Sequence, residues 1–340
     1  MAILTRLFHL PRKGSNARGD DSDYVYQPAL GDLSFDEAVD ALHRKGYSTV
    51  LGGVDGESPH IVAEVKARLR GCGITVEDYS IDVASFQNYL LQAQYSERYP
   101  SYYAVNLLEK HVEHFVTLDL LALNAGDVFI DIASEDSPVP DIFERVSRAR
   151  TYAQDIQYKN GIHGRKIGGD ACAMPLQDQS ITKAALTCSL EHFERDGDSR
   201  VLAELARILK SGGIVVVAPL YLSVNDATQT DSLYSAHVDV PFDPGTILHC
   251  ARDWKNRHGS VLFARNLEAT PPRSAFRQSS VPSPVPPKFC QYPDARLFEV
   301  CPRRDQTLVR SVLTLGKYDR NGRGKALTNS RDRIGEANAF

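Results

Sequence analysis

Apolar segments of strand length alternate with amphipathic segments of helix length in the middle of the chain, and this alternation constrains the fold more than any other feature. The apolar runs are "VFIDI" (128–132), "TYAQDI" (151–156), "AALTCSL" (184–190) and "IVVVAPL" (214–220). Apolar residues recur at helical spacing in "PDIFERVSRA" (140–149) and "SRVLAELARILKSGG" (199–213). Strands that are apolar throughout are typical of a parallel sheet with helices on both faces. We therefore predict an α/β fold with a doubly wound, Rossmann-like, mostly parallel sheet.

The rest of the chain divides into regions. Residues 31–85 are expected to form a small α/β unit, since "SFDE" (34–37) has the form of a helix capping box and helix and strand patterns follow it. The main domain is expected over 86–316, with a helical lid at about 86–122, a core at 126–222 and a variable C-terminal part with a Pro/Ser-rich loop at 270–288. Two last strands are expected near 295–302 and 308–318. Residues 1–30 and 317–340 are expected to be a flexible N-terminus and a polar tail.

Composition argues against several classes of function. The formal charge is -4 and no long basic block is present, so nothing indicates nucleic acid binding. No run approaches the ~18 apolar residues that a membrane-spanning helix needs. The six cysteines are scattered without a C-x-x-C pair. They are interpreted as reduced thiols of a cytoplasmic protein rather than as disulfides or metal ligands.

The turn after the first predicted core strand, "DIASEDSP" (131–138), has no glycine although a nucleotide-binding turn normally has several. Glu135, Asp136 and Asp141 stand at the start of the following helix, where they would repel a pyrophosphate. This disfavours a dinucleotide-dependent oxidoreductase. A cationic ligand suits these carboxylates better, and the alternative is that they are only favourable charges at a helix N-terminus capped by Ser137.

Further polar residues follow the next strands. Asp155 ends the second core strand, where an acid typically accepts hydrogen bonds from a ribose diol. Together "FIDIA", "QDI", "GDACAMPLQDQS", "CSLEHF" and "LAELARILKSGGIVVVAPL" occur in an order that resembles the class I S-adenosylmethionine-dependent methyltransferases, in the group called methyltransferase type 11. The resemblance covers about residues 105–222.

The resemblance implies S-adenosylmethionine as cofactor and assigns its binding residues. It implies that Asp131 closes the first strand, that Asp155 binds the ribose, that Asp170 and Ala171 contact the adenine, and that the segment starting at Ser189 faces the cofactor and the substrate. The turn departs from the family pattern, because Ala133, Glu135 and Ser137 stand where three glycines are usual. The predicted contacts in the turn are Ala133, Ser134 and Glu135, and our hypothesis is that the Glu135 carboxylate binds the ammonium group of the cofactor.

His192, with Glu191 beside it, is the predicted catalytic base, although packing at a helix start is an alternative role for this histidine. Methyl transfer to a small-molecule or glycan acceptor is the predicted function. The alternative is a catalytically inactive relative that serves as a binding or scaffold protein. Several other polar residues precede or surround the core and are weaker candidates: His163 and His237 for an acceptor pocket, Tyr95, Tyr99, Tyr102 and Tyr103 for a lid or a packing cluster, and Glu109, Lys110, His111 and His114 for the solvent face of their helix.

Overall fold

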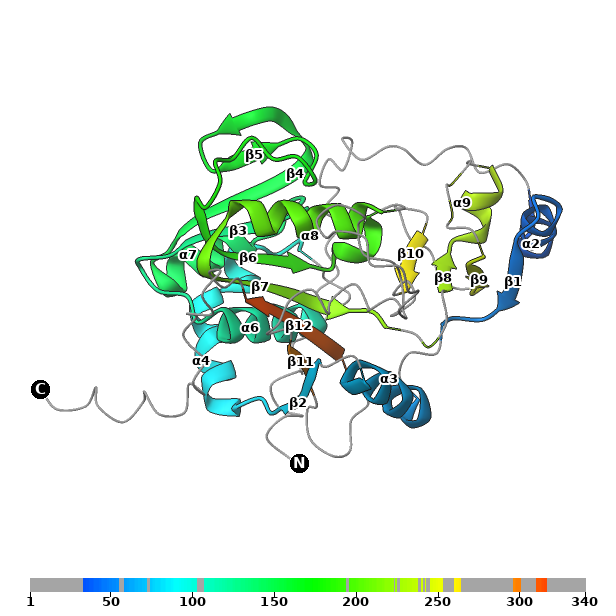
Figure 1. The fold of residues 1–340 in the computed structure, drawn as a ribbon, viewed down its shortest axis with the longest axis horizontal. Helices are drawn as coiled ribbons and strands as arrows, with labels where there is room; N and C mark the ends of the chain where they lie inside the picture. The colour runs from blue at the N-terminus through cyan, green and yellow to red at the C-terminus, as the bar shows by residue number, and fades with distance from the viewer. Residues whose placement is uncertain are drawn as a thin grey trace, which may run out of the picture.

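The structure is a computed structural model. It describes residues 33–54, 58–71, 74–102, 107–193, 196–222, 227–237, 245–252, 260–263, 296–300 and 310–316, together with residues 224, 240 and 242. The expected N-terminus (1–30), Pro/Ser-rich loop (270–288) and polar tail (317–340) lie outside these residues. Figure 1 shows a main body built around a large sheet, and a smaller group of elements beside it that includes α2 and α9.

The main sheet confirms the predicted fold class. Within the described residues it has eight strands in the order β2-β11-β12-β7-β6-β3-β4-β5. All neighbouring pairs are parallel except those made by β12, which runs antiparallel to β11 and to β7. The strands are β2 (Thr75–Tyr79), β3 (Val128–Ile132), β4 (Arg150–His163), β5 (Lys166–Gly168), β6 (Ile181–Thr187), β7 (Leu209–Leu220), β11 (Arg296–Val300) and β12 (Arg310–Gly316).

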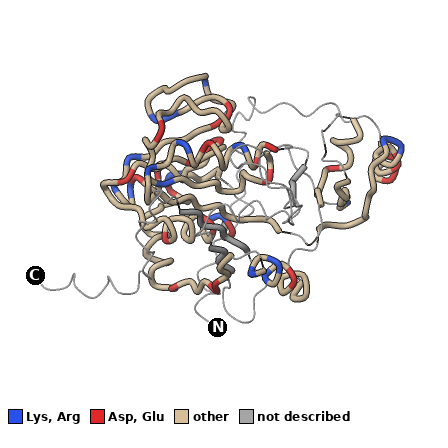
Figure 2. The backbone as a smooth tube through the Cα atoms, viewed as in Figure 1, with Lys and Arg blue, Asp and Glu red and all other residues tan. Residues whose placement is uncertain are grey.

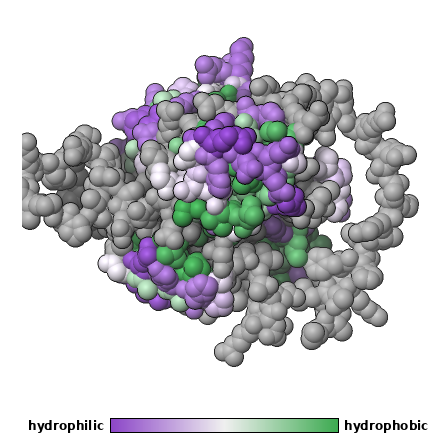
Figure 3. Space-filling view, turned by 90° about the vertical axis from the view of Figure 1, so that its right-hand side faces the viewer, coloured by the Kyte–Doolittle hydropathy of each residue, from purple (hydrophilic) through white to green (hydrophobic). Residues whose placement is uncertain are grey.

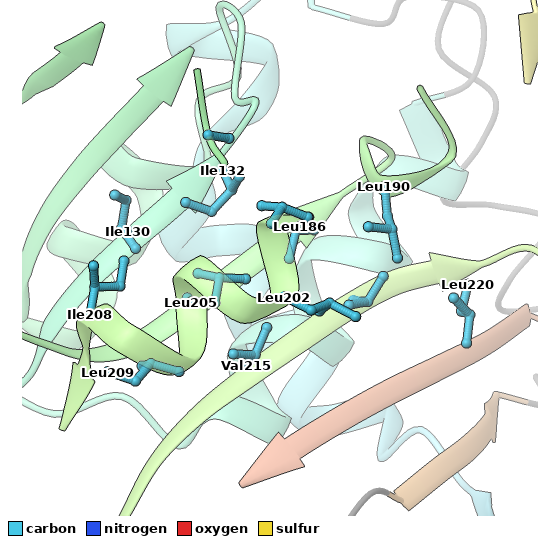
Figure 4. Packing of buried hydrophobic residues seen from close by; sticks show 14 of the residues in the cluster. Ile130, Ile132, Leu186, Leu190, Leu202, Leu205, Ile208, Leu209, Val215 and Leu220 are labelled. Atoms are coloured by element: carbon cyan, nitrogen blue, oxygen red, sulfur yellow. The ribbon is translucent and has the colours of Figure 1, made fainter. Parts of the chain in front are cut away.

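Helices cover both faces of this sheet because its strands are apolar on both faces. Ile130 and Ile132 of β3 belong to the cluster that includes α3 (Pro59–Gly71) and α8 (Gly197–Ile208), and Phe129 belongs to the opposite cluster. Leu202, Leu205 and Ile208 of α8 pack on β3, β6 and β7 (Figure 4). Burying one such side chain contributes roughly 1.5–3 kcal/mol. The opposite face is covered by α4 (Val83–Ala93), α6 (Leu107–Leu121) and α7 (Val139–Ser147), with the short α5 (Tyr95–Arg98) between α4 and α6.

A second sheet has the order β1-β9-β8-β10 within the described residues. Its strands are β1 (Ser48–Leu51), β8 (Ala227–Thr230), β9 (Ile247–Cys250) and β10 (Ser260–Phe263), and it is accompanied by α2 (Phe35–Arg44) and α9 (Ser232–His237). The predicted capping box of α2 is present, with Ser34 and Glu37 bonded reciprocally. The two described strands of 31–85 enter different sheets, since β1 pairs with β9 and β2 pairs with β11.

Two element boundaries differ from the predicted ones. The helical pattern of 199–213 predicts a helix up to its glycines, but α8 ends at Ile208 and β7 begins at Leu209, which pairs with Ile181 of β6. Gly213 is needed inside β7, because a Cβ atom there would lie 2.9 Å from the Lys210 carbonyl oxygen. Strand β4 also runs on to His163 and folds back onto β5.

Charged residues of both signs are spread over the same elements. Lys and Arg are interspersed with Asp and Glu along the described chain (Figure 2). Among the described residues, no helix is both long and apolar enough to span a bilayer. Figure 3 views the end of the molecule that carries α2 and β1, and it shows apolar surface gathered next to hydrophilic surface; Val50 and Leu51 of β1 are exposed.

Candidate functional site

The candidate site lies where the carboxyl ends of β3, β4 and β6 meet. The chain order reverses between β3 and β6, and ligands of open α/β sheets bind at such a switch point. The ends of these two strands are joined by side-chain hydrogen bonds. Thr187 Oγ1 donates to Asp131 Oδ1 over 3.3 Å, and Ser189 Oγ donates to the Ile132 carbonyl oxygen over 3.1 Å. The predicted site residues Asp131 and Ser189 are far apart in the sequence, and these bonds bring them together.

Asp131 is fully buried at the end of β3. Burial raises the pKa of its carboxyl group to about 8, against the Thr187 hydroxyl group, which donates to Oδ1 and acts to lower it. Its Oδ2 atom has no hydrogen-bond partner among the described residues. At neutral pH this carboxyl group is protonated, so Oδ2 can carry the proton and donate to a ligand or water.

The glycine-free turn follows a left-handed path. Ala133 has a φ of 51° and Glu135 a φ of 49°, a region that costs a residue with a Cβ atom roughly 1–2 kcal/mol. These are two of the three positions where the family pattern has glycine. The turn therefore takes the backbone conformation that glycine permits, without having glycine.

Strand β4 holds the turn in this conformation. Gln154 Oε1 accepts from the Ala133 N–H over 3.1 Å, and the Gln154 carbonyl oxygen accepts from Ser134 N–H over 2.9 Å. Asp155 Oδ2 accepts from the Glu135 N–H over 2.7 Å. The role of Gln154 was not predicted from the sequence. The available signal was its position directly before Asp155, the predicted ribose-binding residue.

Asp155 is buried and is already engaged within the chain. Its Oδ1 atom accepts from Gln157 N–H over 2.9 Å, in addition to the bond from Glu135 to Oδ2. The hydroxyl group of Tyr158 donates to the Glu135 carbonyl oxygen. Tyr158 thus bridges β4 and the turn, a role that the sequence did not reveal. The carboxylate of Asp155 has two further lone-pair positions that can accept from a ligand.

The loop 168–175 is anchored to α8 by Glu204 and Arg207, which belong to the quoted segment "LAELARILKSGGIVVVAPL". Glu204 Oε1 accepts from the Met174 N–H over 2.7 Å, and the Arg207 guanidinium donates to the carbonyl oxygens of Met174 and Leu176. Ala171 is buried in the core beside this loop, whereas Asp170 is exposed and its Oδ1 accepts from the Cys172 N–H. The predicted adenine contacts of Asp170 and Ala171 remain predictions.

The predicted catalytic pair lies on a short 3-10 helix, η1 (Leu190–His192), directly after β6. Leu190 packs into the sheet core and fixes this helix (Figure 4). Glu191 is buried, His192 is partly exposed, and His192 Nε2 lies 4.0 Å from Glu191 Oε1. Strand β10 of the second sheet lies against η1.

The prediction that the polar residues of α6 form a solvent face is wrong for Lys110 and His114, which are buried. Lys110, Glu113, His114 and Thr117 recur at helical spacing, so the buried part of this helix carries polar side chains beside the apolar Phe115 and Val116. Lys110 Nζ lies 2.7 Å from Glu113 Oε2 and 2.5 Å from Cys188 Sγ, one residue before Ser189. The helical periodicity of these polar residues was the signal in the sequence. It was overlooked because polar residues on a helix were expected to face solvent.

The remaining sequence candidates lie elsewhere. His163 and His237 are exposed. The described tyrosines of the expected lid favour the packing alternative, because Tyr95 is buried and bonds to Tyr89 and to His114. Tyr103 lies outside the described residues.

Residues 141–217 match the family model described as "Methyltransferase domain". The match lies inside the segment on which the resemblance was based, and it confirms the predicted class. Residues 141–217 therefore resemble a methyltransferase domain, and the doubly wound sheet is the fold expected for the class I type.

Several solved structures are similar to part of this chain. The YcgJ protein from Bacillus subtilis is 17% identical, with 33% of this chain and 52% of that chain covered and a TM-score of 0.29. The PH0226 protein from Pyrococcus horikoshii is 17% identical, with 36% and 60% covered and a TM-score of 0.29. Geranyl diphosphate C-methyltransferase from Streptomyces coelicolor, in complex with Mg2+, geranyl diphosphate and S-adenosyl-L-homocysteine, is 14% identical, with 37% and 52% covered and a TM-score of 0.26. The chain spans about half the length of the first of these relatives. No curated protein matches the chain.

Proposed function

We propose that the chain is an S-adenosylmethionine-dependent methyltransferase that acts on a small-molecule or glycan acceptor in the cytoplasm. The observation that carries the proposal is the left-handed path of the turn after β3 at Ala133 and Glu135. The turn at the switch point therefore has the backbone conformation of a cofactor-binding turn, although it has no glycines. The methyltransferase match over 141–217 supports the same reading.

Two observations indicate that the residues of the site fit such a cofactor. Asp131 offers a buried carboxyl oxygen without a partner among the described residues, and Asp155 keeps lone pairs for a diol. Asp131, Ala133, Ser134, Glu135 and Asp155 would hold the ribose and methionine parts. Asp170, Ala171 and Ser189 would line the rest of the cofactor. When bound, the cofactor supplies an electrophilic methyl group for an in-line displacement.

His192 is proposed as the base that removes a proton from the acceptor group, with Glu191 orienting its ring. The 4.0 Å between His192 Nε2 and Glu191 Oε1 allows a carboxylate to stabilise the imidazolium that forms. Because β10 lies against η1, the second sheet is proposed to cover the acceptor side of the site. His192→Ala should lower the rate of methyl transfer by roughly 10²–10⁴-fold without changing cofactor affinity.

The test is binding of S-adenosylhomocysteine measured by isothermal titration calorimetry. Glu135→Gln should abolish or strongly weaken binding, because it removes the carboxylate proposed to receive the ammonium group. Asp136→Asn is the matched control, since Asp136 is the exposed neighbouring acid. Loss of binding in the control with normal binding in Glu135→Gln would contradict the role given to Glu135.

A second candidate, a binding or scaffold protein without catalysis, is favoured by one observation. Asp155 and Tyr158 both bond to the turn, which closes the space between the ends of β3 and β4 from within the chain. Under this alternative, S-adenosylhomocysteine gives no thermal stabilisation of the wild type or of Tyr158→Phe. A stabilisation of RT ln(1 + [L]/Kd) in the wild type supports the enzyme instead.

A further inference from the structure

A lysine, a glutamate and a cysteine meet in the interior beside the candidate site. Lys110 and Glu113 come from α6, and Cys188 follows β6. Lys110 Nζ lies 2.5 Å from Cys188 Sγ, and Glu113 Oε2 lies 2.7 Å from that nitrogen and 3.1 Å from that sulfur. Only 7% of the Lys110 side chain and 5% of the Glu113 side chain are exposed. The three groups therefore form one mutually bonded cluster.

The backbone holds these groups in place. Cys188 has a φ of 50°, in the left-handed region, and its N–H donates to the Ala218 carbonyl oxygen of β7. Lys110 and Glu113 lie one turn apart on α6, which packs on β6 and β7. Since both the helix and the strand end are fixed by core packing, the nitrogen and the sulfur have little freedom to separate.

Glu113 is the proton acceptor of the cluster. Burial acts to lower the pKa of the Lys110 ammonium group, but Glu113 and Cys188 raise it above its ordinary value. Burial raises the pKa of the Glu113 carboxyl group, although Lys110 opposes this effect. Burial, and then the Glu113 carboxylate, raise the pKa of the Cys188 thiol well above its ordinary value, against the opposing effect of Lys110. Glu113 is therefore a stronger proton acceptor than an ordinary carboxylate, and it contacts both groups that must lose a proton before they form a bond.

We propose that Cys188 and Lys110 are a site of oxidative cross-linking, at which a peroxide-type oxidant joins the cysteine sulfur to the lysine nitrogen. In the first step the sulfur attacks one peroxide oxygen, the O–O bond breaks, and the thiol becomes a sulfenic acid with release of water. In the second step the ammonium proton passes to Glu113 and the neutral nitrogen attacks the sulfur. The S–N bond forms, the S–O bond breaks, and the hydroxyl group leaves as water with a proton from nitrogen. Thiol and amine together lose two hydrogen atoms, and hydrogen peroxide is reduced to two water molecules.

The cross-link has a direct structural consequence. It joins α6 to the residue immediately before Ser189, which bonds to the end of β3. Oxidation thereby ties the helix that covers one face of the sheet to the segment that carries Glu191 and His192. Cys188 is partly exposed, whereas Lys110 and Glu113 are buried, so the oxidant of this proposal must be small.

The experiment treats the full chain with hydrogen peroxide, blocks remaining thiols with iodoacetamide, and identifies tryptic peptides by mass spectrometry. We expect one species that joins the peptide of Cys188 to a peptide uncut at Lys110, lighter than their sum by two hydrogen atoms. Dithiothreitol should release both peptides, because thiols cleave an S–N bond.

Two variants sharpen the test. Lys110→Arg keeps the positive charge but replaces the amine by a poor nucleophile, so Cys188 should proceed to sulfinic acid. Cys172→Ser removes another partly exposed thiol and should leave the cross-link unchanged. The proposal is overturned if peroxide leaves Cys188 of the wild type reduced or converts it to sulfinic acid while trypsin still cuts at Lys110. The wild-type result decides even if a variant does not fold.

Discussion

Replacing Ala133 by glycine should leave the stability of the protein nearly unchanged or raise it slightly, whereas the same replacement in an ordinary strand lowers stability. Ala133 has a φ of 51°, so the substitution relieves roughly 1–2 kcal/mol of left-handed strain. The added chain entropy of glycine in the unfolded state costs about 0.5–1 kcal/mol. Loss of a half-buried methyl group costs about 0.4 kcal/mol, half of the value for full burial. The free energy of unfolding should therefore change by between about -0.4 and about +1.1 kcal/mol, with a midpoint of about +0.4 kcal/mol.

The matched control is Ala153→Gly in β4, which deletes the same methyl group at similar partial burial in an extended strand. It should lower the free energy of unfolding by about 1 kcal/mol, because no strain is relieved. Urea unfolding followed by circular dichroism measures both values. The two variants should differ by roughly 1–2 kcal/mol. Equal destabilisation by both would refute the left-handed assignment of the turn.

Three further predictions concern the carboxylates that organise the site. Asp131 has a pKa of about 8 in the folded state and an ordinary value of 3.8, so the native state holds the extra proton between these values. The free energy of unfolding should fall as pH rises through that window, by up to about 1.4 kcal/mol per unit. Asp131→Asn should flatten this slope in urea titrations at several pH values. Asp155→Ala leaves two backbone N–H groups without their acceptor and should cost about 2–4 kcal/mol in the same assay. Glu204→Ala should cost about 1–3 kcal/mol and raise hydrogen exchange at the Met174 amide, whose acceptor it removes.

The core of the fold could be predicted because it depends on local patterns. Continuous apolar strands and amphipathic helices over 126–222 require a covered parallel sheet, and the main sheet has this form. The pairing of distant segments could not be read in the same way. Strand β2 joins β11 and β1 joins β9, and each partner lies more than 190 positions later in the chain. No local periodicity encodes such a partner, since pairing is decided by which sheet edge remains open.

The structure brings together those predicted residues that follow strands. Asp131, Asp155 and Ser189 lie close to one another because strand ends meet at one edge of a parallel sheet, and their binding roles stay predictions. Lys110 and Glu113 were missed because charged residues on a helix are usually solvated, and only tertiary packing shows that this helix buries them. Their cost of burial is offset by the bonds that they make to each other and to Cys188.

The missing glycines and the acceptors at the end of β4 are physically linked. Left-handed conformations at Ala133 and Glu135 together cost roughly 2–4 kcal/mol. Three N–H groups of the turn bond to Gln154 and Asp155, and such bonds contribute about 0.5–1.5 kcal/mol each, or about 1.5–3 when the acceptor is charged. The sum is of the same size as the strain. A turn with glycines adopts the left-handed conformation without steric cost, whereas this turn is held in that conformation by its hydrogen bonds to β4. Its shape is therefore set before a ligand arrives, and a change at Gln154 or Asp155 should alter the turn as much as a change in the turn itself.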